Sequence, residues 1–170
     1  MITSANVAPA AIDASPDAAK RAALVRYFGN EGKDRETSHE MYADDAILEF
    51  PQSGERFFGK RTIQEWRERY PAKTDFRLRR LSGAGDVWSA EILISYEGRA
   101  PMYGVGLYEF RGGKVVREAV YVMDGFDAQE WRAPWATRFD PLASIAPAEW
   151  RDGVPFGLEA DLIASDQTKT

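Results

Sequence analysis

The chain has no cysteine and only one histidine, His39. The absence of cysteine excludes disulfide bonds, a thiol nucleophile and a cysteine-based zinc site. A single histidine argues against a two-histidine metal site and against a Ser-His relay that uses a second histidine. There is also no G-x-S-x-G elbow and no phosphate-binding loop. The composition therefore predicts no metal and no cofactor.

Long apolar runs and an excess of positive charge are also missing. The apolar runs are far below the roughly 18 residues that cross a bilayer, and the N-terminus lacks the basic start and apolar core of a signal peptide. The formal net charge is −5, with basic residues scattered among acidic ones, whereas nucleic acid requires a basic patch. We expect a cytoplasmic protein that binds neither membranes nor nucleic acid.

The chain of 170 residues is long enough for one core and too short for two comfortable domains. Residues 1–15 are rich in Ala, Ser and Pro and predict a flexible tail, whereas residues 16–125 predict a single folded domain. Residues 126–156 contain three tryptophans and are too apolar for a free linker. We expect this extension to pack on the domain or on a partner subunit, and residues 157–170 to form a polar tail.

Helical periodicity predicts three helices, at about residues 16–30, 33–42 and 60–70. A Ser15–Pro16 pair supplies an N-cap and a first-turn proline for the first of them. The second helix is expected to place Tyr42 at its inner end.

The third predicted helix has an apolar stripe of Ile63, Trp66 and Tyr70. Its N-terminus is expected to carry a capping pattern of Thr62 and Glu65. Its Arg and Glu residues are interpreted as a solvated face.

Alternating apolar and polar residues predict two short strands before the third helix and four strands after it. The first short strand, Ala46–Phe50, stops at Pro51, which has no N–H for a ladder; Phe57 and Phe58 belong to the second. The later strands are predicted at residues 76–78, 87–96, 103–110 and 115–123. Short turns between them favour antiparallel hairpins. The predicted fold class is α+β, with helices against one face of a curved antiparallel sheet.

The run YADDAILEFP, followed by Gly59, the Ile63/Trp66 helix, EGR and FRGGKVV, resembles the nuclear transport factor 2-like, or SnoaL-like, superfamily. The resemblance covers about Ala18 to Asp124. It implies a cone-shaped pocket and a homodimer through the outer face of the sheet. Because the superfamily hosts many chemistries on one scaffold, the resemblance is more specific for fold than for activity.

Ketosteroid isomerase, one member of this superfamily, can be laid on the chain almost continuously. Its oxyanion tyrosine falls on Tyr27, its general-base aspartate on Phe50 and its oxyanion aspartate on Gly106. Two of the three groups are missing, so steroid isomerisation by that mechanism is not expected. Scytalone dehydratase needs two histidines and limonene epoxide hydrolase an Asp-Arg-Asp arrangement, and we find no counterpart for either.

The register that the resemblance implies turns one set of side chains into a common apolar pocket. The expected substrate-binding residues are Tyr42, Leu48, Phe50, Trp66, Trp88, Ile92, Gly104, Gly106, Val120 and Val122. The expected catalytic residues are Glu118 as proton acceptor and Tyr27 or Tyr108 as donor to a developing oxyanion. The small residues Gly104 and Gly106 are interpreted as leaving room for a ligand.

Glu118 is the most informative of these residues. On an apolar strand face, desolvation would raise its pKa toward the range useful to a general acid or base. A register shifted by one residue would instead expose Glu118 and turn Arg117 inward, and the sequence leaves both registers open. His39 is interpreted as a partly buried structural histidine.

The sequence thus predicts a SnoaL-like protein that binds a small hydrophobic organic molecule. The first hypothesis is a cofactor-free acid/base enzyme of isomerase, cyclase or dehydratase type. The alternative is a non-catalytic ligand-binding or interaction module, which the loss of both family aspartates favours.

Overall fold

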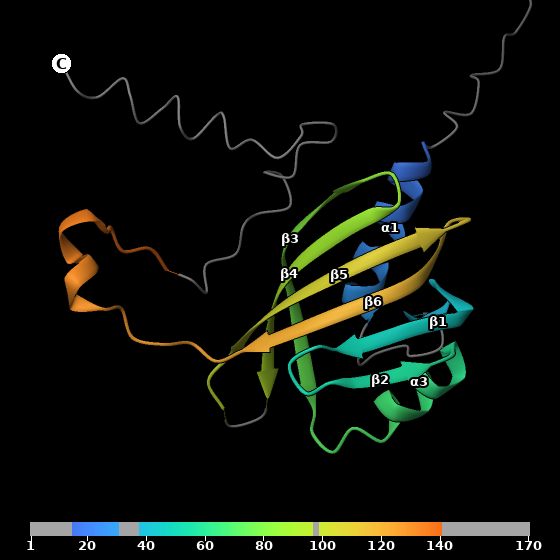
Figure 1. Cartoon of the computed structure of the whole chain (residues 1–170), viewed down its shortest axis with the longest axis horizontal. Coiled ribbons are helices and arrows are strands. Elements are labelled where there is room, and N and C mark those ends of the chain that lie inside the picture. Colours follow the sequence, from blue (N-terminus) through green and yellow to red (C-terminus); the bar gives the residue numbers. More distant parts are fainter. Residues whose placement is uncertain (1–14, 31–37, 97–98, 141–170) are drawn as a thin grey trace, which may run out of the picture.

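The computed structural model describes residues 15–30, 38–96 and 99–140, and a curved six-stranded sheet forms its centre (Figure 1). The strands are β1 (Tyr42–Phe50), β2 (Glu55–Phe58), β3 (Thr74–Ala84), β4 (Val87–Tyr96), β5 (Met102–Arg111) and β6 (Lys114–Met123). Their order in the sheet is β2-β1-β6-β5-β4-β3. Neighbouring strands are antiparallel except for β1 and β6, which run parallel. The predicted α+β class is confirmed, with this one parallel pair as a difference.

Two helices, α1 (Pro16–Asn30) and α3 (Lys60–Glu68), pack against the inner face of the sheet. From α1, the ring of Tyr27 lies 6.2 Å from the ring of Tyr42, and the ring of Phe28 lies 6.3 Å from that of Tyr108. From α3, Ile63 is fully buried. None of the described helices is long and apolar enough to span a bilayer.

The prediction that Tyr42 ends a helix is wrong. Ser38 and His39 are helical, but Tyr42 begins β1, because its backbone already pairs with Val115 of β6. A distant strand therefore overrides the local helical pattern. Residues 33–37 of the predicted helix lie outside the described residues.

The predicted capping pattern of α3 is also wrong. The N-cap is Gly59, at φ +84°, and no side chain caps the helix. Gly59 adopts a left-handed backbone that other residues rarely use, so the chain turns sharply into α3 at this glycine. Thr62 and Glu65 lie inside the helix instead.

The register of the sheet settles the orientation of Glu118. Leu48 of β1 and Tyr108 of β5 are its partners on either side, and all three are buried. Arg117 lies on the outer face, where it pairs with Glu49 and Glu109. Of the two registers that the sequence left open, the one with Glu118 inside is correct.

The chain beyond β6 extends away from the sheet (Figure 1). It contains a short 3-10 helix, η1 (Glu130–Trp135), in which no residue is buried. Residues 141–156 of the predicted extension and the predicted polar tail at 157–170 lie outside the described residues, as do residues 1–14 of the predicted N-terminal tail.

Candidate functional site

A cavity of about 700 Å³ is enclosed by the inner face of the sheet, by α1 and by α3. Most of its wall is apolar or aromatic and consists of Phe28, Phe50, Trp66, Phe76, Ile92, Ile94, Val120 and Val122. A smaller polar part is formed by Ser38, His39, Arg67 and Glu118, with Tyr27 and Tyr108 beside it. An apolar cavity with a few convergent polar groups is typical of small-molecule sites.

Glu118 lies at the centre of a buried polar triangle. Arg67 Nη2 donates to Glu118 Oε2 at 3.1 Å, and the Tyr42 hydroxyl donates to the same oxygen. Arg67 Nη1 in turn donates to the Tyr42 hydroxyl at 2.9 Å. Because both donors bind Oε2, the other carboxylate oxygen, Oε1, receives neither of these hydrogen bonds.

The ion pair between Arg67 and Glu118 is shielded from water. The side chain of Arg67 is 11% exposed and that of Glu118 only 2%. Removing one member of such a pair leaves an uncompensated buried charge, which costs about 3–5 kcal/mol. The guanidinium of Arg67 also lies 5.2 Å from the ring centre of Tyr27 and 5.4 Å from that of Tyr42, where cation–π attraction adds to its stabilisation.

Tyr42 and the neighbouring His39 have defined hydrogen-bonding roles. Burial raises the pKa of Tyr42 well above its ordinary value, although Arg67 partly opposes this, so the hydroxyl stays protonated and can donate to Glu118. His39 Nε2 lies 3.4 Å from Arg67 Nη1. Because a guanidinium can only donate, Nε2 must be the accepting nitrogen of the ring.

All three predicted catalytic residues, Glu118, Tyr27 and Tyr108, line the cavity. Six of the predicted substrate-binding residues also line it: Phe50, Trp66, Ile92, Gly106, Val120 and Val122. The other four, Tyr42, Leu48, Trp88 and Gly104, are buried without being part of its lining. Tyr42 lies behind Arg67 and Glu118, and Leu48 and Trp88 belong to the packed core.

The Cβ positions of the two glycines on β5 are occupied, contrary to the interpretation that both leave room for a ligand, although Gly106 itself lines the cavity. A Cβ atom on Gly104 would lie 2.6 Å from Ile92 Cγ1, and one on Gly106 would lie 2.6 Å from the Tyr108 hydroxyl. The space beside each glycine is therefore filled by the protein's own side chains.

Arg67 is a residue of the candidate site that the sequence interpretation does not include. It was assigned to the solvated face of α3, yet it lies four residues after the buried Ile63, on the same helical face. That spacing was a usable signal, and the charge of the residue obscured it. The surroundings of Glu118 therefore contain a cation where an apolar strand face was expected.

Among the described residues, no group of three or more histidine and acidic side chains is arranged to hold a metal ion. Besides Glu118, Arg67, His39, Tyr27 and Tyr108, the titratable groups that line the cavity are Lys73, Tyr70 and Tyr96. Burial raises the pKa of Tyr96 to about 12. The hydroxyl of Tyr96 therefore stays protonated at neutral pH.

Comparison with known proteins identifies the fold family. No protein-family profile and no curated protein matches the chain. Among solved structures, an NTF-2 like protein of unknown function from Burkholderia xenovorans LB400 is 41% identical, with a TM-score of 0.68 over 72% of this chain and 96% of its own.

Two more distant structures share the fold. A protein provisionally named a ketosteroid isomerase, from Kribbella flavida DSM 17836, is 22% identical, with a TM-score of 0.66 over 73% of this chain and 92% of its own. A protein provisionally named a SnoaL-like polyketide cyclase, from Shewanella putrefaciens CN-32, is 16% identical, with a TM-score of 0.53 over 61% and 89%. From its 41% identity to the Burkholderia protein over 72% of its length, this chain belongs to the nuclear transport factor 2-like superfamily.

Proposed function

We propose that the protein is a cofactor-free acid/base enzyme that moves a proton on a small hydrophobic organic compound, in a reaction of isomerase, cyclase or dehydratase type. One observation carries this proposal. Among the residues that line the cavity in the described part of the chain, Glu118 is the only carboxylate, and it lies at the polar end of an otherwise apolar wall. The apolar walls favour a ligand with a ring-containing or aliphatic skeleton, and the polar end of the cavity would orient an oxygen atom of that ligand.

The arrangement of donors around Glu118 supports a role as proton acceptor. Arg67 and Tyr42 both hold Oε2, so Oε1 is the oxygen that would take a proton from a C–H group next to a carbonyl. Negative charge would then develop on the carbonyl oxygen of the substrate. The Tyr27 and Tyr108 hydroxyls are the proposed donors to that oxyanion, and the same carboxyl group would return the proton to another carbon.

The proposal is tested first by native mass spectrometry of protein purified without added ligand, followed by identification of any released compound. That compound, or a panel of cyclic ketones if none is found, is then incubated with the protein in D₂O. We expect deuterium to enter positions next to the carbonyl, and Glu118→Gln to slow this exchange by about 100-fold or more, as the loss of a general base does.

Glu49→Gln is the matched control. Glu49 is also a strand glutamate paired with arginines, but it lies on the outer face of the sheet. Its substitution is expected to leave the exchange rate unchanged. An exchange rate in Glu118→Gln equal to that of the unmodified protein would remove Glu118 from the mechanism.

The second candidate function is a non-catalytic ligand-binding module. It is favoured by the ion pair between Arg67 and Glu118, because a carboxylate that neutralises a cation is less available as a base. A non-catalytic module predicts that a compound binds in the cavity. After incubation in D₂O, that compound would be recovered without deuterium from both the unmodified protein and Glu118→Gln. An empty cavity that binds no member of the panel would contradict both candidates.

A further inference from the structure

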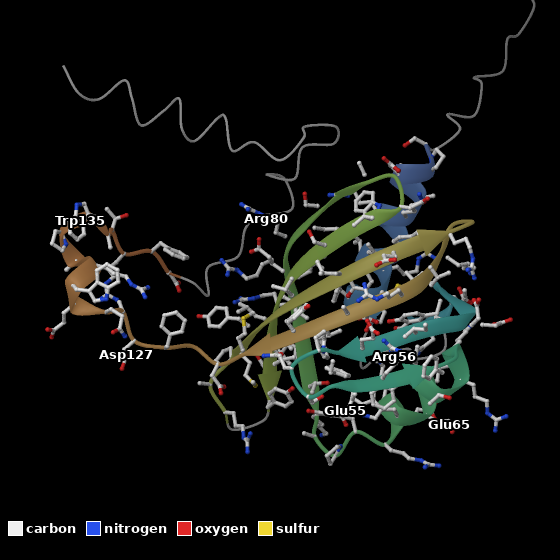
Figure 2. All side chains as sticks on the ribbon, viewed as in Figure 1. Glu55, Arg56, Glu65, Arg80, Asp127 and Trp135 are labelled. Carbon is white, nitrogen blue, oxygen red and sulfur yellow. The ribbon has the colours of Figure 1, made fainter. Side chains whose placement is uncertain are left out.

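The cavity is closed at one end and open at the other. Glu118, at the polar end, is only 2% exposed, whereas residues 70–73, which follow α3, line the cavity and are all exposed. Thr74 and Tyr96 lie beside them in the lining, on paired positions of β3 and β4. Figure 2 shows Trp135 of η1 well away from the sheet, so η1 does not cover this opening. Residues 70–74 and Tyr96 are called the mouth of the cavity below.

Polar hydrogens converge at the mouth, and the protein leaves several of them without an acceptor. The Tyr70 and Tyr96 hydroxyls are 3.2 Å apart, so only one of their two O–H groups is used in the hydrogen bond between them. In the described part of the chain, no residue accepts from the remaining O–H group, from the Thr74 hydroxyl or from the Lys73 ammonium group. An ammonium group carries three donors and no acceptor. The mouth is therefore suited to a ligand group that only accepts hydrogen bonds.

The mouth is also positively charged. Lys73 is its only charged residue, and it forms no ion pair with any residue that the structure describes. Burial raises the pKa of Tyr96, and the positive charge of Arg99, which lies nearby, partly opposes this. Across the described lining of the whole cavity, the charged groups are two cations, Arg67 and Lys73, and one carboxylate, Glu118. One positive charge is therefore in excess, although the chain as a whole carries a net charge of −5.

We propose that the mouth binds a carboxylate and that the substrate is a hydrophobic organic acid, with its reacting carbonyl group at the Glu118 end of the cavity and its carboxylate at Lys73. Between the two ends the wall is apolar, with Phe76, Ile92 and Ile94 among its residues. The acid therefore carries its two oxygen-containing groups at opposite ends of an apolar skeleton. The position of the carbonyl group rests on the proposed function, whereas the carboxylate site is a binding property that requires no turnover.

A carboxylate matches the mouth better than a phosphate does. A carboxylate carries one negative charge and accepts hydrogen bonds through both of its oxygens, so it neutralises the excess positive charge of the lining. A phosphate ester with two negative charges would leave the lining with a negative charge in excess. The charge balance therefore favours an acid with a single negative charge.

The polar end of the cavity is a weaker place for this carboxylate. The charge of Arg67 is already neutralised there by Glu118, at 3.1 Å, and a ligand carboxylate would lie next to that of Glu118. Like charges that share a poorly hydrated site repel each other. At Lys73, by contrast, the ligand meets no anion among the described residues that line the mouth.

Isothermal titration calorimetry with two matched probes tests the carboxylate site. 2-Naphthylacetate and 2-naphthylacetamide have nearly the same shape and differ in charge. At pH 7 and low salt we expect the unmodified protein to bind the acid about 10-fold or more tighter than the amide, because hydrogen bonds between charged groups are stronger than neutral ones. Added salt should narrow the difference, because it screens the charge of the exposed lysine.

Lys73→Met is the variant that tests the site directly. We expect it to reduce the preference for the acid to less than about 2-fold and to leave the affinity for the amide unchanged, because methionine keeps most of the apolar stem of lysine without its charge. Lys73→Arg should retain the preference. Lys60→Met, at the start of α3 and outside the cavity lining, makes the same change in net charge and should change neither affinity.

Two results would overturn the proposal. One is equal affinity of the unmodified protein for the acid and the amide, or binding of neither probe. The other is a preference for the acid that persists in Lys73→Met and grows in Glu118→Gln, which would put the carboxylate at the polar end.

The outcomes for the carboxylate site and for the proposed function are separate. A preference for the acid that depends on Lys73, with no deuterium exchange in any compound, would support the carboxylate site and contradict the enzyme. Exchange in neutral cyclic ketones, with equal affinity for the two probes, would support the enzyme and overturn the carboxylate site.

Discussion

At the scale of single residues, the buried polar side chains at one end of the cavity form a network in which each group has a hydrogen-bond partner within the network. Glu118 receives hydrogen bonds from Arg67 and Tyr42, and Tyr42 receives one from Arg67. Buried polar groups are stable only when their partners are present. The residue proposed for chemistry therefore also contributes to the stability of the site, and the two contributions must be measured separately.

Tyr42→Phe is expected to destabilise the protein by about 1–3 kcal/mol, because it removes a donor to a buried carboxylate and an acceptor for a buried guanidinium. Urea unfolding at pH 7 measures this loss. Tyr121→Phe, at a half-buried position on the outer face, is the control and should cost less than about 0.5 kcal/mol. Equal losses in the two variants would show that the network contributes no stability.

At the scale of elements, α1 is fastened to the turn between β3 and β4. Lys20 Nζ donates to the carbonyl oxygen of Gly85 at 2.6 Å and to Asp86 Oδ1 at 2.7 Å. The backbone N–H of Gly85 donates to the carboxylate of Asp17 at 3.1 Å. These bonds hold α1 across the inner face of the sheet, where Tyr27 and Phe28 form part of the cavity wall.

Lys20→Met is expected to cost about 1–3 kcal/mol, since α1 loses a charge-assisted hydrogen bond to Asp86 and another to the Gly85 carbonyl, which keeps only Trp88 Nε1 as a donor. Hydrogen exchange should speed up in α1 more than in β5 or β6. Arg26→Met, at an exposed position of the same helix, serves as the control. Uniform acceleration across the whole domain would argue against a local fastening of α1.

At the scale of the whole molecule, a row of ion pairs crosses four strands on the outer face. Arg56 of β2 pairs with Glu49 of β1 at 2.5 Å, Glu49 with Arg117 of β6 at 2.6 Å, and Arg117 with Glu109 of β5 at 2.7 Å. Hydrogen bonds from Arg117 and Arg56 hold the pKa of Glu49 below its ordinary value of 4.5. Hydrogen bonds to Glu109 and Glu49 raise the pKa of Arg117.

This row predicts a loss of stability in acid. Because the pKa of Glu49 is lower in the folded state than in the unfolded state, its stabilisation is present above about pH 4.5 and disappears as the pH falls through the folded value. Glu49→Gln is expected to cost about 1 kcal/mol at pH 7 and to lose less stability than the unmodified protein between pH 5 and pH 3.

The measurement is the free energy of unfolding as a function of pH for both proteins. Glu65→Gln removes an exposed i,i+4 pair with Arg61 on α3 and serves as the control. Its acid profile should follow that of the unmodified protein. A Glu49→Gln profile parallel to the unmodified one would mean that Glu49 has no part in acid sensitivity.

Much of the fold and part of the site could be predicted from local patterns. Alternation of apolar and polar residues located most of the strands, and the resemblance supplied the register that turns Glu118, Tyr27 and Tyr108 toward one cavity. These features depend on residues a few positions apart, whose spacing fixes which side chains share a face.

Contacts between distant residues were beyond such patterns. Tyr42 became a strand residue because β6 pairs with it, and the space beside Gly104 and Gly106 was taken by neighbouring side chains. The polar partners of Glu118 are 51 and 76 positions away in the chain. The order of helices and strands follows from short-range steric and hydrophobic preferences. The charge that faces Glu118 depends on how α3 packs against β1 and so brings Arg67 to β6, which no local spacing encodes.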